Sequence, residues 1–384
     1  MVAAVRRGQS LRSVARRFRV RLATVQYWVR HAAGQRLDRV DFTTRPSAPR
    51  RTRRTDPAME ERVITARQQL QRDSDLGDHG AAAIHQALRD QGVACVPSVR
   101  TIGRILRRRG LLDARTRVRR PPPPRGWYLP RLAARRVELD SFDKVEGLVI
   151  KDGPHVEILN GVSLHGGLPA SWPVAEPLLA RQVVDALVEH WRAWGLPGYA
   201  QFDNESLFQG THTHPDVVGR VTRLCLSLGV TPVFAPPRET GFQAMTEGFN
   251  NLWQARVWRR FTHTDLASLQ DRSTRYLTAL RRHRVERIDA APRRRRFPAG
   301  WRLNLQKRLG GLIIYLRRTN AEGDVELLGR RFQVGGTWPG RLVRAEVDLD
   351  AECIRFYALR RREPTQQPLL ASVPYSLPHR RFHE

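Results

Sequence analysis

Three carboxylates are placed where they could act together on a phosphate ester: Asp140, Asp203 and Glu247. Asp140 lies in an expected strand, Asp203 directly follows a second strand, and Glu247 lies in the helix after a third. Side chains that leave neighbouring strand ends and a facing helix converge in a crevice beside the sheet. Oxygen ligands without His or Cys favour hard cations, so the expected cofactor is Mg²⁺, with Mn²⁺ as a substitute.

A pair of Mg²⁺ ions about 4 Å apart would activate a water molecule or a 3′-hydroxyl and stabilise the leaving oxygen of a phosphodiester. In this scheme Asp140 bridges the ions, Asp203 shares one of them and Glu247 completes the other. A lone Asp at a strand end is usually a turn residue, but three carboxylates in this order favour a site. Two neighbours are alternatives: Asp143 for Asp140, and Glu239 for Glu247.

An α/β catalytic core over residues 135–290 is expected to position these carboxylates. Alternating apolar residues predict strands, and apolar residues at helical spacing predict amphipathic helices between them. The expected strands are 137–142, 155–164, a short stretch near Trp172, 199–202 and 231–234. The expected helices are 178–191, 215–228, 242–261 and 264–284. Strands alternating with helices in this way are typical of an α/β fold.

Residues 1–39 are expected to form an all-α helix-turn-helix DNA-binding domain. Apolar residues repeat at helical spacing from Leu11 through Phe18 and again from Val25 through Val29. Arg19 lies in the intervening turn, where a glycine would tolerate a positive φ more easily. The outer face of the second helix is expected to reach phosphates and base edges through Arg21, Thr24, Gln26, Tyr27 and Arg30.

A second helical DNA-binding domain, winged-helix or helix-turn-helix in type, is expected at residues 57–112. It follows a linker at 40–56 that is rich in Pro, Thr and Arg. Its last helix is apolar on one side and carries Arg104, Arg107 and Arg108 on the other, a pattern suited to tracking phosphates. An Arg/Pro linker at 113–134 then leads to the core, with a polyproline run at 121–124.

Short alternating strands separated by Gly, Asn and Asp turns predict a small β-barrel over residues 300–363. The expected strands are 311–317, 325–328, 331–334, 342–347 and 353–358. A DNA-binding role is expected for this domain because residues 251–384 are strongly basic. The Pro- and Arg-rich residues 364–384 are expected to be a disordered tail.

The charge of the chain is distributed unevenly. The 384 residues carry a net charge of +30, divided as +19 in residues 1–130, −4 in 131–250 and +15 in 251–384. Basic flanks suit a polyanionic partner, and an acidic middle suits an enzyme that binds cations rather than a histone-like protein. The three cysteines, Cys95, Cys225 and Cys353, lack the spacing of a zinc site. No apolar run approaches the roughly 20 residues that span a bilayer, which predicts a cytoplasmic, nucleoid-associated protein without a membrane partner.

The carboxylate motifs resemble those of the DDE transposases of bacterial insertion sequences, which have a retroviral-integrase-like core. The matching segments are VELDSF at 137–142, QFDNESLF at 201–208, FAPPR at 234–238 and EGFN at 247–250. With helical modules before the core and β-strands after it, the resemblance covers nearly the whole chain. It implies a ribonuclease-H-like fold for the α/β core.

Three features depart from the family pattern. Glu205 stands where a glycine usually follows the Asp-Asn pair, and the 44 positions from Asp203 to Glu247 exceed the usual interval, with 209–216 as the inserted stretch. Gln254 stands where many relatives carry Lys or Arg. Residues 250, 251 and 254 share the helical face of Glu247, so a polar DNA-facing surface is still expected. Its members are Asn250, Asn251, Gln254 and the nearby Arg256.

The resemblance implies a multidomain transposase or integrase that nicks DNA at mobile-element ends and joins the 3′-hydroxyl to target DNA. The expected partner is double-stranded DNA, at element ends and target, held by a homodimer or a higher oligomer. Two other functions remain open from the residues: a non-catalytic helix-turn-helix regulator with a relic nuclease domain, and a structure-selective nuclease. Loss of strand transfer with retained DNA binding in Asp203→Ala would favour the transposase.

Overall fold

The computed structural model describes residues 1–43, 55–112, 126–211, 214–239, 241–335, 338–379 and 382. The chain divides into two units, Met1–Glu60 and Glu61–Glu384. The predicted linker at 40–56 and the Arg/Pro linker lie largely outside the described residues, as does the polyproline run. Among the described residues, no helix combines the length and the apolar character that crossing a membrane would need.

The first unit contains three helices, α1 (Val2–Arg6), α2 (Leu11–Arg17) and α3 (Leu22–His31), and a 3₁₀ turn, η1 (Leu37–Arg39). The Ser10 hydroxyl caps α2 by accepting a hydrogen bond from the Ser13 N–H. Val14 and Val25 are fully buried between the helices, as the apolar spacing predicts. Phe18 was expected in the same stripe, but it is 45% exposed because it lies in the C-cap of α2.

Arg19 adopts a φ of 53° in the turn between α2 and α3. A side chain with a Cβ is strained in this left-handed region, whereas glycine is not. The left-handed conformation costs an L residue about 1–2 kcal/mol, and the extra freedom of glycine in the unfolded chain costs about 0.5–1, so we expect Arg19→Gly to raise the free energy of unfolding of the first unit by about 0.5–1 kcal/mol. Thermal unfolding of the full chain should show the gain, and Arg19→Ala should not. Equal stability of the two variants would contradict a backbone origin.

A three-helix module opens the second unit. Its helices are α4 (Pro57–Asp73), which begins in the first unit, α5 (Ala81–Asp90) and α6 (Val99–Arg108). The three predicted helices are therefore present, and Ile84, Leu88 and Ile102 form their buried centre. The N-terminus of α6 is capped by Ser98, whose hydroxyl accepts from the Thr101 N–H.

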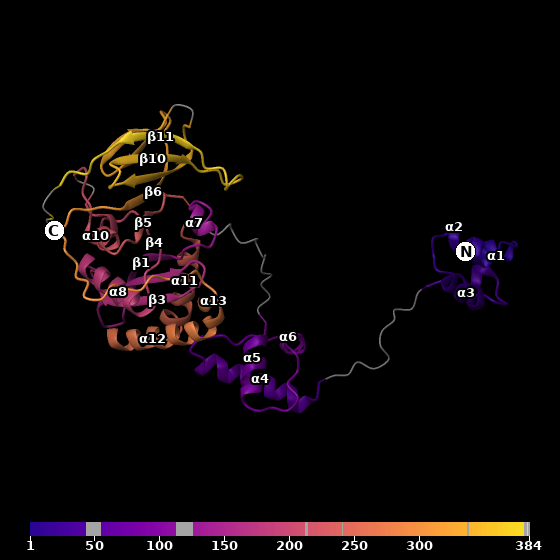
Figure 1. Ribbon diagram of the computed structural model, residues 1–384. Coiled ribbons are helices and arrows are strands. Elements are labelled where there is room, and N and C mark those ends of the chain that lie inside the picture. The colour runs from indigo at the N-terminus through magenta and orange to yellow at the C-terminus, as the bar shows by residue number, and fades with distance from the viewer. Residues whose placement is uncertain are drawn as a thin grey trace. The chain divides into compact units, whose positions relative to one another are not determined.

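The central sheet has nine strands in the order β11-β10-β9-β6-β5-β4-β1-β2-β3 (Figure 1). Its first part consists of β1 (Leu139–Val149), β2 (His155–Ser163), β3 (Pro169–Ala175), β4 (Tyr199–Phe202) and β5 (Thr231–Phe234). Strand β1 pairs antiparallel with β2 and parallel with β4, and β4 pairs parallel with β5. This mixed sheet agrees with the expected α/β core. Strand β1 runs seven residues beyond the predicted end at residue 142.

Helices cover both faces of this part of the sheet. Helices α8 (Ala180–Trp194), α9 (Ser206–Gln209) and α10 (Arg220–Ser227) contribute to the core that contains Phe142 and Phe202. On the other face, α11 (Ala244–Trp253), the π-helical turn η2 (Gln254–Trp258) and α12 (Leu266–His283) pack on Val145 and Ile158, and α13 (Val285–Asp289) follows. The single long helix expected at 242–261 thus ends in a π-helical turn.

The expected C-terminal β-barrel is instead an extension of the central sheet. Strand β6 (Leu312–Arg318) pairs parallel with β5, and β9 (Leu342–Asp348), β10 (Cys353–Ala358) and β11 (Leu369–Pro374) continue outward from it. Figure 1 shows these yellow strands beyond β6. Strands β7 (Asp324–Leu327) and β8 (Arg330–Gln333) form a separate hairpin. A separate barrel is therefore not confirmed, because β6 pairs with the edge of β5 and its neighbours continue the same sheet.

Two segments expected to lack structure are partly folded. Residues 126–134 of the predicted linker contain α7 (Pro130–Ala133), and Tyr128 donates a hydrogen bond to the Gln201 side chain over 3.0 Å. In the predicted tail, β11 forms the sheet edge, and the hydroxyl of Tyr375 donates to Asp216 over 3.0 Å. Tyr128 and Tyr375 are buried, and this apolar burial stabilises two segments whose composition predicted no structure.

Candidate active site

Residues 140 and 143 lie on opposite faces of β1. Because side chains alternate along a strand, Asp140 and Phe142 share one face and Ser141 and Asp143 share the other. Phe142 packs edge-on against Trp191 of α8. On the opposite face, Ser141 accepts a hydrogen bond from Thr246 of α11 over 2.6 Å. Asp140 therefore points away from the helix that carries Glu247.

Asp140 is fully engaged in a buried ion pair, an environment that does not suit the metal-ligand role predicted for it. Its carboxylate accepts two hydrogen bonds from Arg294, at 2.9 and 2.5 Å, and a third from the Trp191 indole at 3.1 Å. Burial would raise the pKa of Asp140, but the charge of Arg294 and hydrogen bonds from His190 and Arg294 lower this pKa below its usual range. The carboxylate serves as a structural anchor.

Asp143, the alternative to Asp140, lies beside Asp203. The parallel register pairs Asp140 with Ala200 and Ser141 with Gln201. Continued by two residues, this register brings Asp143 level with Asp203, at the carboxyl ends of two neighbouring strands. Both side chains are partly exposed, so both can reach solvent and a ligand. The pair that the structure supports is therefore Asp143 and Asp203.

Helix α11 completes the group from above the sheet. Asn250 donates to Asp143 over 2.8 Å and accepts a hydrogen bond from the Asn160 amide over 2.9 Å. Glu247 lies on the same helix and is exposed, and its charge acts on Asp143. The chain thus gathers Asp143, Asp203 and Glu247 on one side of the sheet. Asn250 was predicted to face DNA, but it is buried and orients Asp143 instead.

The electrostatics of this site favour a bound cation. Burial raises the pKa of Asp203 to about 7, and the charges of Glu205 and Asp143 add to the rise. Burial likewise raises the pKa of Asp143 to about 6, with contributions from Glu205 and Glu247. Carboxylates that repel one another in a partly desolvated site are stabilised by a positive charge placed among them.

Glu205 and Lys144 are two residues whose role the sequence did not reveal. Lys144 lies 3.2 Å from Glu205 and 3.6 Å from Glu157, and its positive charge acts on Asp203. The Glu205 N–H also donates to Asp203 over 3.0 Å. The departure from glycine at position 205 therefore adds a negative charge beside Asp203. The unusual glutamate at position 205 was the feature of the sequence that could have indicated this extra charge.

The donors fit a hard divalent cation by their chemistry, since all are carboxylate oxygens. Among the residues that the structure describes, no three His, Cys, Asp or Glu side chains are arranged so as to hold one metal ion. The alternative ligand Glu239 is unsuitable because its carboxylate forms ion pairs with Arg318 and, over 3.2 Å, with Arg361. The fit to a divalent cation therefore rests on the type of donor atom and on the mutual repulsion of the carboxylates at residues 143, 203 and 247.

The residues predicted to contact DNA differ in accessibility. Exposed or partly exposed are Arg21, Thr24, Gln26, Tyr27, Arg30, Arg104, Arg107, Arg108, Asn251 and Gln254. Tyr27 stacks on His31 with ring centroids 5.9 Å apart. Gln254 accepts a hydrogen bond from Arg259 over 3.0 Å. These side chains remain candidates for DNA contact, and Asn250 does not.

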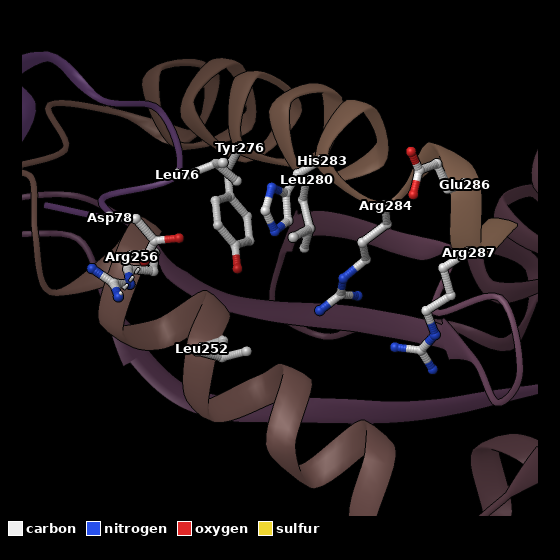
Figure 2. A pocket seen from close by; sticks show the side chains of 10 residues that line it. All are labelled: Leu76, Asp78, Leu252, Arg256, Tyr276, Leu280, His283, Arg284, Glu286 and Arg287. Atoms are coloured by element: carbon white, nitrogen blue, oxygen red, sulfur yellow. Dashed lines mark hydrogen bonds and ion pairs between the residues drawn. The ribbon is translucent and has the colours of Figure 1, made fainter. Parts of the chain in front are cut away.

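Arg256 binds the three-helix module rather than facing outward. Its guanidinium donates to the Gly77 carbonyl and forms an ion pair of 3.0 Å with Asp78. It lines a pocket of about 420 Å³ between α11, α12, α13 and the loop after α4 (Figure 2). Two other arginines of this pocket, Arg284 and Arg287, donate to carbonyls of residues 164–167. The arginines of this pocket therefore mainly hold parts of the protein together, because they bind the loop after α4 and residues 164–167.

No protein-family model and no curated protein matches the chain. Among solved structures it is similar to the catalytic core domain of BIV integrase, with 19% identity and a TM-score of 0.28 over 37% of this chain and 82% of that chain. It is also similar to a chain of a simian T-cell lymphotropic virus intasome in complex with PP2A regulatory subunit B56 gamma. There the identity is 14% and the TM-score 0.36, over 79% of this chain and 95% of that chain. Both TM-scores are below 0.5.

Proposed function

We propose that the protein is a transposase or integrase that cleaves DNA and joins its strands with the help of divalent cations. The observation that carries this proposal is the alignment of Asp143 with Asp203 beside α11, where their pKa values are raised to about 6 and about 7. Repelling carboxylates in a strongly basic chain are suited to holding Mg²⁺ against a polyanion.

In this proposal Asp143, Asp203 and Glu247 would hold the cations, and Asp143 would take the place expected of Asp140. Bound Mg²⁺ would supply activation of a water or 3′-hydroxyl and stabilisation of the leaving oxygen. Asn250 fixes the Asp143 carboxylate, since it is itself held by Asn160. Thr246 ties α11 to β1 through Ser141, which keeps Glu247 over the strand ends.

The helical modules would bring the DNA to this site. Arginines on the exposed side of α6 suit phosphates, and the outer face of α3 suits the major groove. Holding two DNA ends together would need a dimer or larger assembly. The carboxylate alignment favours an enzyme over a regulator, because a protein that only binds DNA gains nothing from charges that repel both one another and phosphate.

The test is cleavage of labelled duplexes that carry the sequences flanking the gene. With Mg²⁺ we expect nicks that leave 3′-hydroxyl ends, followed by joining to target DNA, and none of this with EDTA. Protons compete with the cation for Asp203 and Asp143, so the rate should fall as the pH drops through about 7 and about 6.

Calcium serves as a control, because it is expected to bind the carboxylates without supporting efficient strand cleavage. Cleavage that persists in EDTA would contradict the proposal. Cleavage that shows no preference for the flanking sequences would point to a structure-selective nuclease on the same site. DNA binding without cleavage under any divalent cation would favour the regulator.

A further inference from the structure

A buried arginine without a carboxylate partner lies on β6. Arg317 is only 9% exposed, and burial lowers its pKa to about 10. Its guanidinium donates to the carbonyls of Leu316 over 2.9 Å and Glu326 over 3.3 Å, and it lies over the Tyr315 ring at 4.9 Å. Among the described residues no carboxylate pairs with it. A buried charge of this kind is costly unless a ligand supplies the opposite charge.

Arg317 forms part of the wall of a groove of about 820 Å³ that runs between the β4–α9 connection, the loop after β5 and the β7–β8 hairpin. Four arginines line this groove against two acidic residues, Asp324 and Glu326. One of the arginines, Arg238, has a φ of 59°, a strained conformation for a residue other than glycine. The groove therefore combines a net positive lining with a buried, uncompensated cation.

The groove begins one residue from the candidate active site. Asn204, which follows Asp203, donates to the Ala235 carbonyl over 2.5 Å and also lines the groove. The same carbonyl accepts a hydrogen bond from Arg317 over 3.4 Å. Gln209 continues this polar wall by donating to Asn204 over 2.6 Å. A single carbonyl thus links the buried cation to the residue beside Asp203.

We propose that Arg317 binds a backbone phosphate of the DNA strand that passes the carboxylate site, and that this groove is the track of that strand. The inference rests on the proposed function for the identity of the polyanion. A phosphodiester would supply the missing negative charge, and Nη2 of Arg317 would donate to it while Nε and Nη1 hold the guanidinium on the carbonyls of residues 235, 316 and 326. The apolar part of the wall, which includes Leu327 and Leu328, would contact sugar or base surfaces.

The first measurement is stability without DNA. Because Arg317 is an uncompensated buried charge, Arg317→Met should melt at the wild-type temperature or above it. A structural guanidinium would instead give a lower melting temperature. Arg302→Met is the matched control, because Arg302 is exposed and loses the same charge. A marked loss of stability in Arg317→Met alone would overturn the proposal.

The second measurement is binding of a short labelled DNA duplex over a range of salt concentrations. Arg317→Met should bind about tenfold more weakly or worse, and its plot of log affinity against log salt should be less steep by about one phosphate contact. Arg317→Lys keeps the charge but cannot donate to the carbonyls and the phosphate from one planar group, so it should give an intermediate affinity. A neutral methylphosphonate can replace each phosphate of the DNA in turn. At one position this replacement should weaken DNA binding by the wild type and leave DNA binding by Arg317→Met unchanged.

Each remaining outcome has a defined meaning. Equal DNA binding by Arg317→Met and Arg302→Met would overturn the proposal. So would stabilisation by inorganic phosphate that depends on Arg317 while DNA binding does not, because the site would then take free phosphate. These are binding readouts, so they are separable from catalysis. If DNA binding depended on Arg317 but no cleavage occurred, only the proposed function would be refuted. If cleavage occurred but DNA binding did not depend on Arg317, only this inference would be refuted.

Discussion

Asp143→Asn is expected to lower divalent-cation-dependent DNA cleavage by about a thousandfold or more, while the protein keeps its fold and its affinity for DNA. The amide removes a cation ligand and retains the size of the carboxyl. It also removes a charge that helps to raise the pKa of Asp203. In the variant, therefore, the pKa of Asp203 should move back toward its ordinary value, which NMR titration of the side chain can follow.

Asp203→Asn should show the same loss of cleavage, because the two carboxylates act as one site. The matched control is Asp185→Asn, which removes one charge from an exposed aspartate of α8, outside the carboxylate site and the groove. It should keep wild-type cleavage. If Asp143→Asn cleaved at the wild-type rate while Asp140→Asn was inactive and stable, the ligand would be Asp140, and the present placement of the site would be refuted.

Asp140→Asn is expected to lower the free energy of unfolding by roughly 3–5 kcal/mol, because it leaves the buried Arg294 without a counter-charge. The side chains of Asp140 and Arg294 are only 2% and 13% exposed, so water can replace little of the lost interaction. Denaturant unfolding of the second unit measures the loss. Cleavage by the folded fraction should stay within a few-fold of the wild-type rate.

A double variant separates the lost ion pair from local damage. Asp140→Leu combined with Arg294→Met replaces both charges by apolar groups and should recover much of the stability, because no unpaired charge remains. Since the pKa of Asp140 is lowered in the folded state, the stabilisation is present above the ordinary pKa of an aspartate and is lost as the pH falls through the lowered value. A mild effect of Asp140→Asn at neutral pH would contradict the structural role.

The identification of Asp143 changes the interpretation of the motif at residues 137–142. Most of that motif lies in β1, and Asp143, the candidate ligand proposed above, lies one position after Phe142. The roles predicted for the polar residues of α11 and η2 also change. Asn250 supports Asp143 from within, and Arg256 of η2 binds the loop after α4. The predicted DNA contacts in this region are therefore left to Asn251 of α11 and Gln254 of η2.

The sequence by itself determined where most elements lie, because local apolar periodicity reflects burial on one side of a helix or strand. Strands β4 and β5 were predicted with the bounds that the structure has, and α8 and α12 within a few residues. It also determined the chemical character of the site: carboxylates within an acidic stretch of a basic chain, with Asp203 and Glu247 among them. These properties depend on residues near one another in the chain.

Only the tertiary structure decided which face of β1 carries the candidate site. Asp140 and Asp143 are the same residue type in one strand, and the choice between them depends on Arg294, which is 154 positions away from Asp140, and on Asn250, which is 107 positions away from Asp143. The pairing of β6 with β5 could not be predicted from the sequence either, because the residues of a strand do not specify which sheet edge it joins. Partners distant in sequence set burial and charge, and these determine whether a carboxylate anchors the fold or can bind a cation.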